Sequence, residues 1–202
     1  RGGWVAGAGA LAGLARPVGV LLVAPIAVEV VLAWRATGWR ERRAQLGAVL
    51  APAAGTLAYL GWVGQRHGAW LDPYRIAESE LLRGSLTDPV SNLVDAGRDL
   101  ARGDQFGSGL HLPWALLFIV LAVVAFRWWP ARYGVFALVV LGVGLTADNL
   151  DSLERYALGA FPLVLAAATL TRHELAERVA LVVSAAGLVA YATLAFLGAS
   201  IP

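Results

Sequence analysis

The chain of 202 residues is 58% hydrophobic and only 15% charged, and its mean hydropathy is +0.66. Soluble domains carry about 25% charged residues, so this chain lacks the polar surface that would cover it in water. Its formal net charge of +2 gives no reason to expect nucleic acid as a partner, and the absence of cysteine excludes disulfides and thiolate sites. The composition predicts an all-α, polytopic integral membrane protein.

All sixteen basic residues are arginine, and Ala, Gly and Val are abundant, which is typical of a high-GC bacterial genome. The chain contains no methionine and begins within apolar sequence, without the layout of a signal peptide. We therefore expect residues 1–202 to be a single transmembrane domain, the C-terminal part of a longer chain in a bacterial plasma membrane.

Apolar windows follow one another along the chain, at 4–15, 17–34, 44–64, 112–126, 133–147, 156–171 and 179–197. A membrane-spanning helix needs ~20 apolar residues, with ~17 as a lower bound. The first window is interrupted by Arg16-Pro17, and those at 133–147 and 156–171 are short. About six transmembrane helices are predicted.

Arginine density predicts the orientation of these helices. The short segments 35–43, 127–132 and 172–178 hold eight arginines in 22 residues. The alternate segments, 65–111 and 148–155, hold six arginines and ten carboxylates in 55 residues. Short arginine-dense loops remain in the cytoplasm, so we expect 65–111 to be an external loop of short interfacial helices.

The segment DNLDSLERYALGAFP places three carboxylates and Arg155 between two apolar windows. Only 22 residues separate Arg132 from Arg155, and 16 separate Arg155 from Arg172. The acidic turn must therefore lie at or just below the outer interface, where charged groups are costly unless they pair or line a wet cavity. Arg155 either binds a phosphate through its planar fork of donors, or pairs with Asp151 or Glu154 to stabilise the helix end.

Two further segments allow a functional and a structural interpretation. Arg16, before a helix-breaking proline, either binds an anion or extends to the interface from the end of a half-helix. Segment 66–89 has residue types that stack on sugars and bind hydroxyls. It also fits a loop on the membrane surface with N-caps at Asp72 and Asp88, and helices over 76–84 and 89–103.

The remaining titratable residues predict no metal or hydrolase site. Glu29 lies inside an apolar window and is expected to bind another helix, although a proton relay or a pair with Arg16 stays open. The histidines His67, His111 and His173 are far apart and lack metal-ligand spacing. We therefore expect no protein metal site and no covalently bound cofactor.

Three segments resemble a known enzyme family, in the family's order. LAGLARPVGVLLVAPIAVE resembles the "R-P-x-G" helix of GT-C glycosyltransferases. YLGWVGQRHGAWLDPYRIAESELLRGSLTDP resembles the segment of PIG-V-like mannosyltransferases in which a tryptophan-bearing helix leads to "G-d-P" and "W-x-R-g". SLERYALGAFPLVLAAA resembles their late "R-Y…F-P" helix.

The resemblance implies transfer of a sugar, typically mannose, from a polyprenyl-phosphate donor on the extracytoplasmic side. The acceptor would be a glycan, a lipid or a protein. In this family the carboxylate that deprotonates the acceptor lies in the first external loop. We expect this chain to start after that loop, so that no residue here matches the catalytic base and residues 1–202 alone are inactive.

Residue roles follow from the matching positions. Arg155, Tyr156 and Arg16 would bind the donor phosphate. The acidic residues Asp148, Asp151 and Glu154 would hold Arg155 in place. On the acceptor side, the resemblance implies roles for His67, Asp72 and Arg83.

A transporter or flippase without catalytic chemistry is the alternative function. Transporters have internal repeats and broken helices. The sequence shows one broken helix, at Arg16-Pro17, and no repeat.

Overall fold

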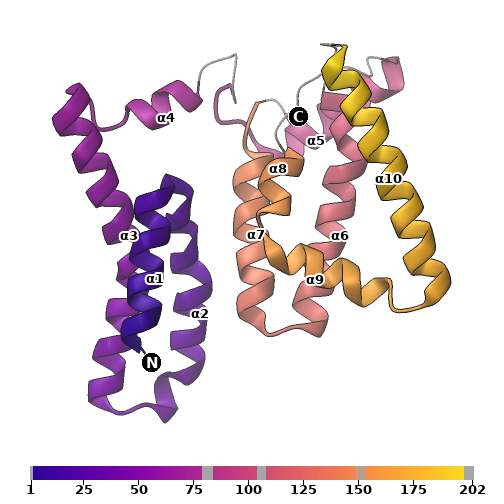
Figure 1. The fold of residues 1–202 in the computed structure, drawn as a ribbon. Helices are drawn as coiled ribbons and strands as arrows, with labels where there is room; N and C mark the ends of the chain where they lie inside the picture. The colour runs from indigo at the N-terminus through magenta and orange to yellow at the C-terminus, as the bar shows by residue number, and fades with distance from the viewer. Residues whose placement is uncertain (1, 79–83, 104–107, 149, 151–152, 198–202) are drawn as a thin grey trace.

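The protein is an all-α membrane protein, as predicted (Figure 1). The computed structural model describes residues 2–78, 84–103, 108–148, 150 and 153–197, and every regular element within them is helical. Four helices are long and apolar enough to cross a membrane, namely Pro17–Ala36, Trp39–His67, Ser108–Trp128 and Glu174–Phe196. Shorter apolar helices are Gly3–Ala15, Ala131–Leu145 and Phe161–Leu170.

The N-terminal helices form one group, on the left of Figure 1. It comprises α1 (Gly2–Ala15), η1 (Pro17–Leu22), α2 (Val23–Ala33), η2 (Trp34–Ala36) and α3 (Trp39–His67). Helix α1 packs along α3, and α2 contacts both α3 and α7 (Ala131–Leu145). The window at 4–15 is thus a short helix that packs in the bundle and ends before Arg16-Pro17.

Glycines allow α1 and α3 to approach closely. A Cβ placed on Gly13 would lie 2.1 Å from the Pro52 carbonyl oxygen, and one on Gly55 would lie 2.0 Å from the Ala10 carbonyl oxygen. Gly9 and Gly13 form a G-x-x-x-G pattern, which brings helix backbones together in membranes. The Thr56 hydroxyl donates to the Gly13 carbonyl at 3.4 Å. Backbone contact, rather than large side chains, therefore holds this pair.

The C-terminal helices form a second group around the main core. It comprises α6 (Leu112–Trp128), α7, α8 (Leu153–Leu158), α9 (Phe161–Leu170) and α10 (Glu174–Phe196). Alanines and leucines of α6 to α9 fill this core, with Phe118 as its one buried aromatic side chain among the described residues. An ion pair joins the two groups, because Arg132 Nη1 of α7 lies 2.6 Å from Glu29 Oε2 of α2. Glu29 thus binds another helix, as expected, but the ion pair is exposed and not the buried hydrogen bond that was predicted.

Helix α10 is the least covered element, and none of its residues is buried. Trp114 of α6 donates from Nε1 to the Tyr191 hydroxyl at 2.6 Å. The indole of Trp114 also lies near Gly187. An apolar helix with this exposure needs lipid or another protein around it.

The predicted span at 156–171 is two helices in the structure. Helix α8 ends at Leu158 and α9 begins at Phe161, at an angle to it (Figure 1). Pro162 has no N–H, and its ring would clash with the Leu158 carbonyl in a continuous helix. The apolar pattern concealed this break, so the prediction of one helix was wrong here.

The predicted external loop contains α4 (Asp72–Ala77), α5 (Pro89–Arg102) and η3 (Ser108–His111). Asp88 caps α5 as expected, and its carboxylate accepts from the Ser91 N–H at 2.9 Å. Asp72 is the first residue of α4 instead of its N-cap, because that helix begins one residue early. The helix expected at 76–84 lies largely outside the described residues.

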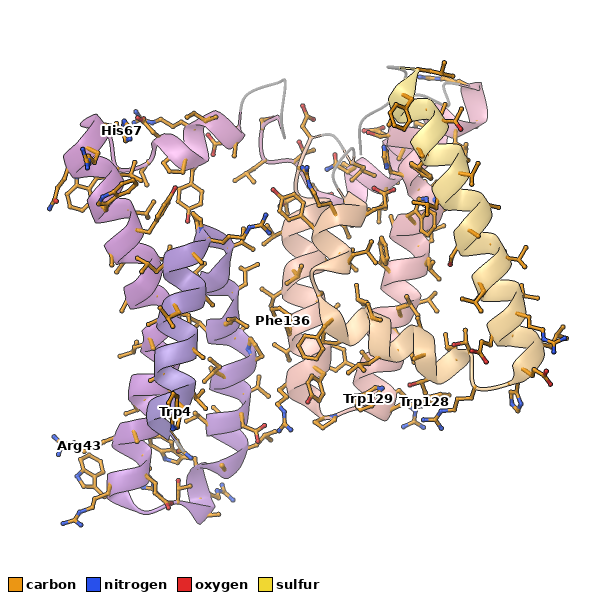
Figure 2. All side chains as sticks on the ribbon, in the orientation of Figure 1. Trp4, Arg43, His67, Trp128, Trp129 and Phe136 are labelled. Carbon is orange, nitrogen blue, oxygen red and sulfur yellow. The ribbon has the colours of Figure 1, made fainter. Side chains whose placement is uncertain are left out.

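The arginine-dense segments lie at one end of the molecule. In Figure 1 the α2–α3, α6–α7 and α9–α10 connections are at the lower end, whereas α4, α5 and α8 are at the upper end. Figure 2 shows Arg43, Trp128 and Trp129 at the lower end and His67 at the upper end. The three arginine-dense segments of the sequence are therefore at the same end of the folded protein.

Candidate functional site

A cavity of about 740 Å³ lies between the two helix groups. Its walls come from the end of α1, from η1, from α7 and from α8, and it includes the three residues predicted to bind the donor phosphate. The lining residues are Ala12, Ala15, Arg16, Pro17, Val18, Gly19, Leu22, Phe136, Val140, Arg155, Tyr156 and Gly159. Figure 2 shows Phe136 between the two groups.

Arg16 is placed by a helix break. Helix α1 ends at Ala15, and Arg16 has an extended backbone with φ −148° and ψ 132°. This conformation follows from Pro17, which disfavours the helical region for the residue before it. The Arg16 N–H still donates to the Ala12 carbonyl at 3.1 Å. No described residue makes a side-chain hydrogen bond or ion pair with Arg16, so its guanidinium is available to a ligand in the cavity.

Arg155 and Tyr156 are placed by α8. Leu153 and Ala157 on the same short helix are buried in the core, which orients the helix. The Arg155 guanidinium carbon lies 6.0 Å from the centre of the Tyr156 ring. A cation at this distance is attracted by the face of the ring. The break after α8 then places Gly159 in the cavity wall.

The cavity has positive charge and apolar walls. Among the described residues, two arginines and no carboxylate line it, and the other lining residues are apolar apart from Tyr156. Guanidinium groups suit phosphate, because they remain charged and present a planar fork of donors. A cavity of this character fits an amphipathic anion, with its charged group at the arginines and its apolar part along η1 and α7.

Glu154 contacts His111. Its Oε1 lies 2.7 Å from Nδ1 of His111, and its Oε2 is buried with no hydrogen-bond partner among the described residues. Successive residues of a helix point about 100° apart, so Glu154 faces α6 while Arg155 faces the cavity. Glu154 therefore does not pair with Arg155 directly, and it can affect the position of Arg155 only by fixing α8.

His111 is a residue that the sequence did not single out. Its side chain is 1% exposed, at the junction of η3 and α6, and it connects this junction to α8. The two residues are 43 positions apart, and His111 lies in none of the motifs of the sequence. Only the folded chain brings them together.

Asp148 contacts the segment that was predicted to be an external loop. Its Oδ1 accepts from the Thr87 hydroxyl at 3.2 Å. A Cβ on Gly84, which has φ +66°, would lie 2.6 Å from the Asp148 Cβ. Asn92 donates from Nδ2 to the Leu145 carbonyl at 2.9 Å. The loop is thus fastened to the end of α7, and Asp148 does not line the cavity.

The other predicted acceptor-side residues lie elsewhere. His67 is exposed at the end of α3, and Asp72 lies in α4, so neither lines the cavity. Asp151 and Arg83 lie outside the described residues. The structure therefore brings together the predicted donor-side residues and leaves the described acceptor-side residues apart from them.

Across the part of the chain that is described, no three His, Asp or Glu side chains gather as metal ligands. Comparisons with family models, with curated proteins and with solved structures find no match for this chain. Its functional interpretation therefore depends on the cavity and on the sequence motifs.

Proposed function

We propose that this chain belongs to a polyprenyl-phosphate-dependent glycosyltransferase of the GT-C superfamily, PIG-V-like, with mannose as the transferred sugar. One observation supports this most directly. The "R-P-x-G" segment and the "R-Y…F-P" segment come from opposite ends of the chain, and both line the same cavity. These are the segments to which the resemblance assigns the donor phosphate.

In the proposed reaction, a bond forms between the acceptor oxygen and the anomeric carbon as the bond from that carbon to the phosphate breaks. The polyprenyl phosphate leaves with increased negative charge. Arg155 and Arg16 would stabilise this charge, because fixed cationic donors need little reorganisation as it develops. The acceptor proton would pass to a base that no residue of this chain matches.

The site is proposed to act on the extracytoplasmic side of a bacterial plasma membrane. Helix α8, which carries Arg155 and Tyr156 of the cavity lining, is at the end of the molecule opposite the arginine-dense connections (Figure 1). The positive-inside rule assigns those connections to the cytoplasm. Polyprenyl carriers lie in the bilayer, so a cavity with apolar walls gives their chains a direct entrance.

A transporter or flippase for a lipid-linked anion is the second candidate. The observation that favours it is the pair of helix breaks, at Arg16-Pro17 and after Leu158, which flank one cavity. Interrupted helices around a binding site are typical of transporters. The sequence indicated only the first of these breaks.

Proteoliposomes that contain the full-length protein separate the two functions. A polyprenyl-phosphate mannose with a labelled sugar is supplied together with a membrane-extract acceptor. We expect the label to move to the acceptor with release of polyprenyl phosphate. Movement of the intact donor between leaflets, without any transferred label, would contradict the transferase and support the flippase.

A further inference from the structure

A second cavity, of about 520 Å³, lies between α2 and α3. Its walls include Ala27 and Val31 of α2 and Leu46 and Val49 of α3, and Trp34 and Arg35 line its end. Ala27 and Arg35 are about 12 Å apart along a helix that rises ~1.5 Å per residue. The cavity is therefore a short apolar groove with a cation at one end.

The groove opens on a surface that suits hydrocarbon. Val31 is 71% exposed, Leu32 is 69% exposed and Leu50 is 65% exposed. All three belong to helices that are long and apolar enough to cross a membrane. Acyl chains of the bilayer are thus the immediate neighbours of this groove.

The end of the groove is strongly basic. The segment 35–43 has four arginines and one carboxylate, Glu41. Arg42 binds Trp34, because its Nε donates to the Trp34 carbonyl at 3.2 Å and its guanidinium carbon lies 5.0 Å from the indole centre. No described residue makes a side-chain hydrogen bond or ion pair with Arg35, which lines the groove.

We propose that this groove binds an anionic phospholipid, with an acyl chain along α2 and α3 and the phosphate at Arg35. The charge complementarity selects this occupant, since Arg35 lines the groove and no carboxylate of the described part of the chain does. Basic pockets between transmembrane helices bind anionic head groups in the same way. The site is separate from the Arg16–Arg155 cavity, which shares none of its lining residues.

Native mass spectrometry of the full chain in neutral detergent tests the proposal. The probes are phosphatidylglycerol and phosphatidylcholine with identical acyl chains. We expect one phosphatidylglycerol to bind at least fivefold more tightly than phosphatidylcholine, since a surface cation contributes about 1 kcal/mol toward an anionic head group. Arg35→Gln should remove most of this preference.

Arg127→Gln is the matched control. It removes the same charge at the same end of the molecule, but from α6, outside the groove. It should leave the affinity within twofold of wild type. Ala27→Phe should narrow the groove and weaken the binding of both lipids.

Three results would overturn the proposal. They are equal binding of the two lipids, equal losses in Arg35→Gln and Arg127→Gln, and full competition by inorganic phosphate. The last would mean that the site takes a free anion rather than a lipid. Melting temperatures within a few degrees of wild type ensure that every variant compared is folded.

Discussion

At the scale of single residues, α8 presents neighbouring side chains to different surroundings. Arg155 and Tyr156 line the cavity, whereas Glu154 contacts the buried His111. A helix of six residues cannot hold its position by its own hydrogen bonds. The contact with His111 and the burial of Leu153 and Ala157 therefore place the arginine at the cavity.

Arg155→Lys tests the proposed role of the guanidinium. Lysine keeps the charge but loses the planar fork and its fit to phosphate. If Arg155 stabilises the departing phosphate, turnover per folded molecule should fall about a hundredfold, which corresponds to ~3 kcal/mol. Arg98→Lys, on the exposed face of α5, is the control and should keep normal turnover. Near wild-type turnover for the Arg155 variant would leave Arg155 with a structural role alone.

His111→Ala tests the buried pair. The substitution leaves the Glu154 carboxylate buried without its partner, which typically costs ~3–5 kcal/mol. The apparent melting temperature in detergent should fall by several degrees. Glu154→Gln should be far milder, because a neutral amide still bonds to the imidazole and removes the buried charge. If Glu154→Gln lowers the melting temperature as much as His111→Ala does, the negative charge of Glu154 itself stabilises the fold, which would contradict this prediction.

At the scale of elements, the position of Arg16 depends on how closely α1 packs on α3. The α1 helix has no large side chain buried against α3, and its register is determined by Gly9, Gly13 and Gly55. A displacement of α1 would move Arg16 relative to Arg155. Packing in one helix pair is therefore coupled to the geometry of the cavity.

Gly13→Ala and Gly7→Ala form a matched pair in α1. The added Cβ at Gly13 would meet backbone of α3, whereas the Cβ at Gly7 would have no atom within 4 Å. Gly13→Ala should cost ~1–3 kcal/mol through overpacking, while Gly7→Ala should be neutral or slightly stabilising. Melting temperatures in detergent measure both. Equal values would mean that α1 does not pack on α3 as described.

The helical class and the arginine asymmetry could be read from the sequence because each depends on composition summed over long segments. The Arg16-Pro17 break was also readable, since proline acts locally. The break after Leu158 could not be predicted, because apolar residues continue on both sides of Pro162 and the hydrophobic window is uninterrupted there. The His111–Glu154 contact was also hidden, because it depends on how distant helices pack.

At the scale of the whole molecule, the exposed apolar surface shows that this fold needs a bilayer around it. Many large apolar side chains are exposed, among them Leu188, which is 72% exposed on α10. The three arginine-dense connections share one end, and α8, which carries Arg155 and Tyr156, is at the other (Figure 1). The orientation of the protein in the membrane would therefore decide from which compartment a ligand reaches the cavity.

Cysteine labelling tests this sidedness directly, because the chain has no native cysteine. Ser85 is exposed in the predicted external loop, and Ala36 is exposed in η2 at the arginine-rich end, so each is replaced by cysteine. With a membrane-impermeant maleimide on intact cells or spheroplasts, Ser85→Cys should react at once. Ala36→Cys should react only after permeabilisation, since arginine-dense loops stay in the cytoplasm. The reverse pattern would place the Arg16–Arg155 cavity on the cytoplasmic side and contradict transfer from an external donor. Labelling of both variants from outside would contradict a crossing of the membrane between η2 and the loop.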